Sequence, residues 1–244
     1  MLMPVSDDNR DRRIIPIVNY LIILANIFVF VYFQELGNNI EFIYSFSTVP
    51  MEIITGKDII TDEQTYVDIS TGNRYEIPGL QPTPIFVYLT ILTSMFMHGG
   101  LAHIFGNMLY LWIFGDNIEN RIGHFRYLIF YLLCGIVASL AHVFSCVLFD
   151  NSLLTPSLGA SGAISGVLGG YLLLFPARRV RVIMFYSLLD VPAIFAIGMW
   201  FLFQVINGIG LLGGQDSGIA YGAHIGGFLA GFLLVTFFTI GRRY

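Results

Sequence analysis

Long apolar runs, separated by short charged segments, dominate the chain. A helix needs about 20 mostly apolar residues to cross a bilayer, and several of the runs approach that length. The pattern therefore predicts an all-α membrane protein built from six helices. The predicted spans are Val18–Phe33, Leu101–Glu119, Tyr127–Phe149, Ser161–Phe175, Val191–Leu212 and Ala220–Ile240. A seventh apolar run, Pro84–Met97, is about 14 residues long, which suits an interfacial or re-entrant helix better than a crossing.

No repeat or composition change divides the chain, so residues 1–244 are expected to form a single membrane domain. Within it, the first span falls in residues 14–36. Residues 37–100 form an external loop that includes the interfacial helix, and spans two to six occupy residues 101–240.

Composition supports a membrane protein. Hydrophobic residues make up 56% of the chain and charged residues only 11%, against about 25% in soluble domains. The net charge of -4 provides no basic patch for nucleic acid. Cys134 and Cys146 both lie in one apolar run, so neither a disulfide framework nor a cysteine metal site is indicated. The expected partners are the lipid bilayer and other membrane proteins.

Basic residues indicate the orientation. With six spans and the N-terminus inside, ten of the twelve Lys and Arg residues are cytoplasmic, and only Lys57 and Arg74 are external. Counting 84–97 as a span leaves inside only the three arginines that precede residue 14, against the positive-inside rule. The sequence therefore predicts a multi-pass protein of the cell membrane with both termini cytoplasmic.

The segment between the first two spans, residues 37–83, is long and acidic and is therefore predicted to be external. Within it, polar and apolar residues alternate around a Gly72–Asn73 pair in the stretch TYVDISTGNRYEI. This alternation predicts a small β-hairpin.

Four polar residues fall inside predicted spans, where polar side chains are costly and tend to face the interior of the bundle. Ser161 precedes the arginine at the cytoplasmic end of its helix by 17 residues, and His103 and His224 each do so by 18. At 1.5 Å per residue, all three lie about 26–27 Å from the cytoplasmic face. Asn107 lies one turn deeper than His103 on the same helix face. We therefore expect these residues to converge near the outer leaflet.

The fourth span is short, at about 22 Å, so its N-terminus must begin within a hydrocarbon core about 30 Å thick. Such an end exposes unpaired N–H groups that favour a developing negative charge, and Ser161 lies there. Two stripes of small residues, one on span four and one on span six, indicate close packing of these helices. The stripes are Gly162, Gly166 and Gly170, and Ala223, Gly227 and Gly231.

Close packing would bring Ser161 within hydrogen-bond reach of His224, as activation of a serine nucleophile requires. No Asp or Glu lies at this depth in any span, so the pattern indicates a Ser-His dyad rather than a triad. Plainer interpretations remain. Ser161 could bond to its own helix, and His224 or Asn107 could bridge helices.

Three stretches resemble the rhomboid family of intramembrane serine proteases. They are FMHGGLAHIFGNMLYLWIFGDNIENRIGHFR, GASGAISG and AHIGGFLAG, which occur on spans two, four and six in the family's order. Together with the long first external loop, the resemblance covers the chain from Ile15 to its C-terminus. It implies a rhomboid-like six-helix bundle that cleaves membrane-protein substrates in or near their transmembrane segments.

The resemblance also implies roles for individual residues. Ser161 would be the nucleophile and His224 the general base, while His103, Asn107 and the backbone N–H of Ser161 would stabilise the oxyanion. Substrate would enter between spans two and five.

Three apolar residues on span five are the expected substrate gate: Phe195, Trp200 and Phe203. No metal or other cofactor is expected. The active site would open toward the extracytoplasmic side.

The sequence departs from the family pattern at two places. The first external loop often carries a Trp-Arg pair, whereas the two tryptophans here are Trp112 and Trp200. Many members place an aromatic residue one turn after the nucleophile, under the histidine, and here that residue is Ser165. We therefore expect other packing to orient His224.

Other classes of function remain open at this stage. A haem protein could use His103 and His224 as axial ligands. A transporter is disfavoured because the two halves show no hydropathy symmetry and the spans lack carboxylates. An inactive rhomboid-like binding protein is disfavoured because both members of the dyad are present.

Overall fold

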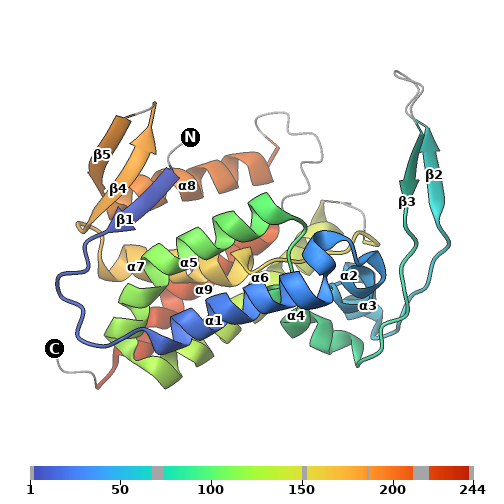
Figure 1. Ribbon diagram of the computed structural model, residues 1–244, viewed down its shortest axis with the longest axis horizontal. Coiled ribbons are helices and arrows are strands. Elements are labelled where there is room, and N and C mark those ends of the chain that lie inside the picture. Colours follow the sequence, from blue (N-terminus) through green and yellow to red (C-terminus); the bar gives the residue numbers. More distant parts are fainter. Residues whose placement is uncertain (1–2, 68–73, 150–152, 186, 211–219, 242–244) are drawn as a thin grey trace.

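The computed structural model describes residues 3–67, 74–149, 153–185, 187–210 and 220–241. It is mainly helical (Figure 1). The longer helices are α1 (Ile17–Phe28), which a π-helical turn continues to Phe33, α5 (Leu101–Ile122), α6 (His124–Leu148), α7 (Ser161–Leu174), α8 (Ala193–Gly208) and α9 (Tyr221–Thr239). The short helices are α2 (Ile40–Phe46), α3 (Pro50–Thr55) and α4 (Thr90–Thr93), with 3-10 turns at Glu35–Gly37, Val87–Leu89 and Ser94–Phe96.

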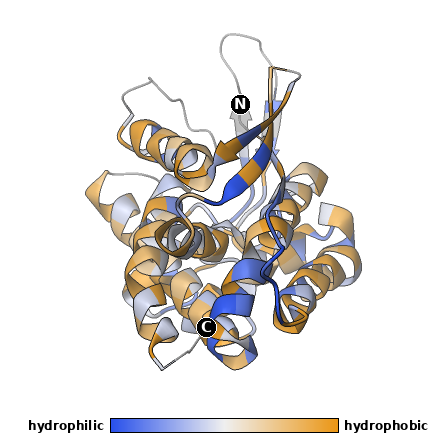
Figure 2. Cartoon of the chain, turned by 90° about the vertical axis from the view of Figure 1, so that its left-hand side faces the viewer, coloured by the Kyte–Doolittle hydropathy of each residue, from blue (hydrophilic) through white to orange (hydrophobic). Residues whose placement is uncertain are grey.

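Each of the six longer helices overlaps one of the six predicted spans. By length and composition, two of the described helices are sufficient to cross a membrane, α6 and α9. Val87–Phe96 and α5 meet at an 80° bend and would together count as a third. The remaining three are apolar but shorter, so the six-span topology stays a prediction. Viewed toward one end of the bundle, the helices are mostly hydrophobic, and polar residues gather on the segments at that end (Figure 2).

The all-α prediction is wrong in one respect, because the described residues also form β-strands. A three-stranded antiparallel sheet has the order β1 (Met3–Asp7), β4 (Arg179–Met184), β5 (Ser187–Pro192). In β4, arginines alternate with the buried valines Val180 and Val182, as in a half-buried strand. The predicted fifth span is therefore wrong at its start, since β5 includes Val191 and the helix begins only after Pro192. Its predicted end, Leu212, lies outside the described residues.

The predicted hairpin in the external loop is confirmed in its strands. β2 (Gln64–Val67) pairs with β3 (Arg74–Ile77) in antiparallel register, and the pair projects away from the helices (Figure 1). The Gly72–Asn73 turn itself lies outside the described residues.

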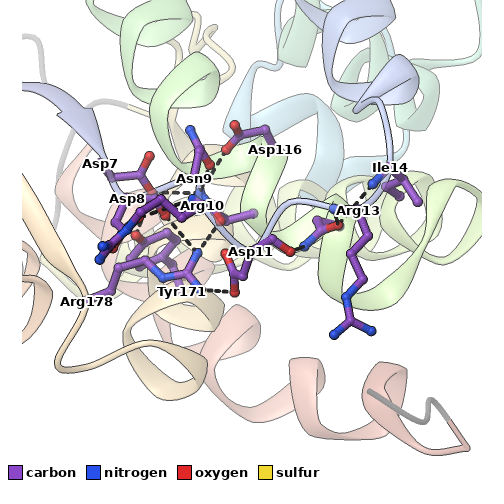
Figure 3. A network of polar contacts seen from close by, with 12 residues as sticks. Asp7, Asp8, Asn9, Arg10, Asp11, Arg13, Ile14, Asp116, Tyr171 and Arg178 are labelled. Atoms are coloured by element: carbon purple, nitrogen blue, oxygen red, sulfur yellow. Dashed lines mark hydrogen bonds and ion pairs between the residues drawn. The ribbon is translucent and has the colours of Figure 1, made fainter.

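The N-terminal segment ties the helices together at the end of the bundle where α7 leads into β4 (Figure 3). The Asp7 carboxylate accepts hydrogen bonds from the Tyr171 hydroxyl at 2.6 Å and from Asn117 Nδ2 at 2.7 Å. Arg178 donates to the Asp8 carbonyl and to the Asp11 carboxylate. Burial raises the pKa of Asp7 to about 7. The first strand is thereby held against α5, α7 and β4.

Helix α7 is the centre of the bundle and packs against α5, α6, α8 and α9. It meets α9 backbone to backbone, because a Cβ atom on Gly227 or Gly231 would overlap the carbonyl oxygen of Gly162 or Gly166. These four small residues therefore lie on the contact as predicted. The third predicted position on α7, Gly170, also faces α9, because a Cβ there would lie 3.3 Å from the side chain of Val235. The closest approach to the backbone of α9 at this level is made by Gly169, which the spacing does not predict. At 3.6 residues per turn, a contact stripe drifts off a strict spacing of four.

Candidate active site

The first residue of α7 and the first turn of α9 meet at the site. Ser161 Oγ lies 2.8 Å from His224 Nε2, which is hydrogen-bond distance. The glycine contacts between α7 and α9 allow this approach, since side chains at those positions would hold the helices apart. The structure thus brings together Ser161 and His224, which the sequence analysis expects to lie at the same depth.

The other ring nitrogen of His224 has a partner that the sequence analysis missed. Gln204 Oε1 on α8 lies 2.8 Å from His224 Nδ1. Trp200, one turn earlier on α8, places its ring centroid 5.9 Å from the imidazole. The available signal was that Gln204 is one of two amides, with Asn207, in a mostly apolar run. These two residues supply the packing that Ser165 cannot.

His103 lies beside the serine. Its Nδ1 accepts a hydrogen bond from the Gly99 N–H at 3.3 Å, so in the neutral ring the proton is on Nε2. A Cβ on Gly159 would lie 3.1 Å from His103 Nε2 and 3.6 Å from Ser161 Oγ. Because residue 159 is a glycine, with φ of +133°, no side chain occupies the small space between His103 Nε2 and Ser161 Oγ.

Asn107 is buried at 8% exposure, one turn after His103 on the same face of α5. Within the part of the chain that the structure describes, its Nδ2 has no hydrogen-bond partner. A bridging role through that group is therefore not supported. A buried amide donor without an acceptor is costly, and such groups in native proteins call for an explanation such as a ligand or catalytic role.

Ser165 does not join the site. Its Oγ donates to the carbonyl oxygen of Ser161 at 2.6 Å, and the residue is 1% exposed. It makes the local helix bond typical of a serine inside a helix.

The three expected gate residues do not share one environment. Trp200 is turned inward toward His224 and Phe228, whereas Phe195 and Phe203 are about half exposed. In this structure Trp200 therefore packs beside the imidazole of His224.

The residues that hold α5 and the loop before α7 also fix the site. The buried Gln34 side chain forms two hydrogen bonds with the backbone of His98, just before α5. The Gly159 N–H donates to the carbonyl of Ser94 at 2.9 Å. The start of α5 is thereby fixed to the end of the first helix, and the loop before α7 is fixed to the 3-10 turn Ser94–Phe96.

Neither ring nitrogen of His224 is free to bind an iron atom, because Gln204 and Ser161 occupy them. This geometry does not favour the haem alternative, which needs His224 as one of its two axial ligands. Among the described residues, no group of three or more His, Cys, Asp or Glu side chains is placed to hold a metal ion.

Comparison with known families identifies the chain. The model of the rhomboid domain matches residues 86–240, a range that contains every residue of the site. The chain belongs to the rhomboid family.

Individual relatives agree with the family model. Rhomboid protein 1, mitochondrial, of Saccharomyces cerevisiae is 32% identical over 63% of this chain and 43% of its own length. RHOMBOID-like protein 4 of Arabidopsis thaliana is 31% identical over 59% of this chain and 32% of its own length. Rhomboid protease GluP of Bacillus subtilis is 36% identical over 58% of this chain and 24% of its own length. The chain spans less than half the length of these curated relatives.

Proposed function

We propose that the protein is an intramembrane serine protease that hydrolyses peptide bonds of membrane-protein substrates through a Ser161–His224 dyad. The contact of 2.8 Å between Ser161 Oγ and His224 Nε2, at the N-terminus of a helix, carries this proposal. Membership of the rhomboid family and the similarity to Rhomboid protease GluP support it.

In the proposed mechanism, Ser161 attacks the scissile carbonyl while His224 takes the hydroxyl proton. His224 then gives this proton to the leaving amine, and water resolves the acyl-enzyme. The oxyanion would be stabilised by His103 Nε2–H, the unpartnered Asn107 Nδ2 and the backbone N–H of Ser161. A substrate helix must unwind locally to expose a peptide bond, which favours segments with helix-weakening residues.

We further propose that the chain is one rhomboid-like membrane domain with six spans, of which the short α7 begins within the bilayer. Both termini lie on the cytoplasmic side of the cell membrane, and the site opens toward the opposite side. The distribution of basic residues supports this orientation.

Substitution of the dyad tests the activity. Wild-type protein in detergent should cleave a transmembrane reporter and react with a fluorophosphonate at Ser161. Ser161→Ala should lose both properties, and His224→Ala should lose cleavage, because each removes one half of the proton-transfer pair. Ser145→Ala is a matched control, since among the described residues its Oγ bonds to the carbonyl of His142 on its own helix and not to the site. Full cleavage by either dyad variant would refute the proposal.

A further inference from the structure

The orientation of an imidazole base depends on both of its ring nitrogens. His224 Nε2 faces Ser161, and to accept the serine proton it must carry a lone pair rather than a hydrogen. The neutral ring must then carry its hydrogen on Nδ1. A group that accepts a hydrogen bond at Nδ1 favours this tautomer.

Gln204 is placed to do this. Its Oε1 lies 2.8 Å from His224 Nδ1, and a carbonyl oxygen can only accept a hydrogen bond. We propose that Gln204 is a positioning residue, which holds His224 in the tautomer that accepts the proton of Ser161. This inference rests on the proposed protease function. It adds the neutral amide of Gln204 to Ser161 and His224 as a third residue of the site.

Trp200 completes the support from the same helix. It lies four residues before Gln204 and therefore on the same face of α8. Its ring lies at 39° to the imidazole plane and also contacts Phe228 of α9, with 6.4 Å between ring centroids. The indole limits rotation of the imidazole while the amide sets its tautomer.

A neutral acceptor suits the location. A carboxylate inside a membrane is expensive, whereas an amide provides an acceptor oxygen without a charge. Within the described part of the chain, the side chain of His224 bonds to Gln204 and Ser161 and to no Asp or Glu.

Kinetics of matched variants test the assignment. Gln204→Met keeps a side chain of similar length but removes the acceptor, so kcat should fall about tenfold, equivalent to about 1.4 kcal/mol, while KM stays within about twofold. Gln204→Glu keeps an acceptor oxygen at the same reach and should restore most of kcat. Asn207→Leu is the matched control, because within the described residues this α8 amide donates to the carbonyl of Phe203 on its own helix and not to His224.

Two kinetic results would overturn the assignment. One is an unchanged kcat in Gln204→Met. The other is an equal fall in Gln204→Met and Gln204→Glu, since that would show sensitivity to any substitution rather than loss of an acceptor.

A spectroscopic measurement keeps the inference testable if Gln204→Met does not fold. In protein labelled with ¹⁵N-histidine, the signals lost in His224→Ala belong to His224. They should show a protonated Nδ1 and an unprotonated Nε2 in the wild type. A protonated Nε2 with a bare Nδ1 in the neutral ring would overturn the inference.

The protease function and the role of Gln204 are tested by different results. If wild-type protein neither cleaves the reporter nor reacts at Ser161, the protease function is wrong. If the wild type is active and Ser161→Ala is inactive, but Gln204→Met retains full kcat, only the role of Gln204 is wrong.

Discussion

Replacement of Gly231 by alanine tests whether backbone contact between α7 and α9 holds the site together. The new Cβ would overlap the carbonyl oxygen of Gly166 and lie 2.5 Å from its Cα. Carbon atoms in contact normally lie 3.5–4.0 Å apart, so the helices must separate by about 1 Å. The obstructing atoms are backbone and cannot rotate away.

The expected cost follows from two opposing effects. Overpacking a well-packed interior costs about 1–3 kcal/mol, and a clash with backbone belongs at the upper end. Alanine in place of glycine gains about 1 kcal/mol of helix propensity. The net loss of stability should be about 2 kcal/mol, roughly a thirtyfold change in the folding equilibrium. Because a misplacement of about 1 Å can cost about a hundredfold in rate, cleavage should also fall.

Gly198→Ala is the matched control, because a Cβ at that position in α8 would meet nothing within 4 Å. It should be neutral or gain up to about 1 kcal/mol. Equilibrium unfolding of both variants in mixed detergent and SDS micelles, followed by circular dichroism, measures the difference. Wild-type stability in Gly231→Ala would refute the packing argument.

Two further predictions concern buried polar groups. The pKa of Asp7 is raised to about 7, so between about pH 4 and pH 7 the folded state binds more protons than the unfolded state, and stability should fall with rising pH by up to about 1.4 kcal/mol per unit. Burial also raises the pKa of Asp116 to about 6, so Asp7→Asn should leave a slope below about pH 6 and remove it between about pH 6 and pH 7. Unfolding measurements from pH 4 to 8 check this, and an unchanged slope between pH 6 and pH 7 would show that another group is responsible. Ser165→Ala should retain most cleavage activity, because its hydroxyl bonds only to the carbonyl of Ser161 at 2.6 Å. A fluorophosphonate adduct found by mass spectrometry on Ser165 instead of Ser161 would contradict this.

The helices, and the common depth of Ser161 and His224 on them, could be predicted because both depend on the local sequence pattern. The predicted fourth span, Ser161–Phe175, differs from α7 by one residue at its end. Counting residues from the arginines that follow each predicted span places Ser161 and His224 at one level, and the structure has them in contact. Apolar runs and helical rise are properties of single segments, so no knowledge of distant partners was needed.

Features that depend on distant partners could not be predicted in this way. Residues 3–7 become a strand only because β4, which pairs Met3 with Ile183, lies beside them in the folded chain. The alternation in β4 is visible in the sequence, but it does not show which segment the strand pairs with. Gln204 was overlooked because an amide in an apolar run gains its meaning only from His224 across the helix interface.

The pairing of β1 with β4 has a consequence for biosynthesis. The partners of the first strand lie near residue 180, so most of the chain must leave the ribosome before the strand can pair. At about 5–20 residues per second, this delay is roughly 10–40 seconds. During that interval the first strand has no other strand to pair with, because its pairing joins residues as far apart as Met3 and Ile183. The sheet must therefore assemble late, after the helices that precede β4 have been made.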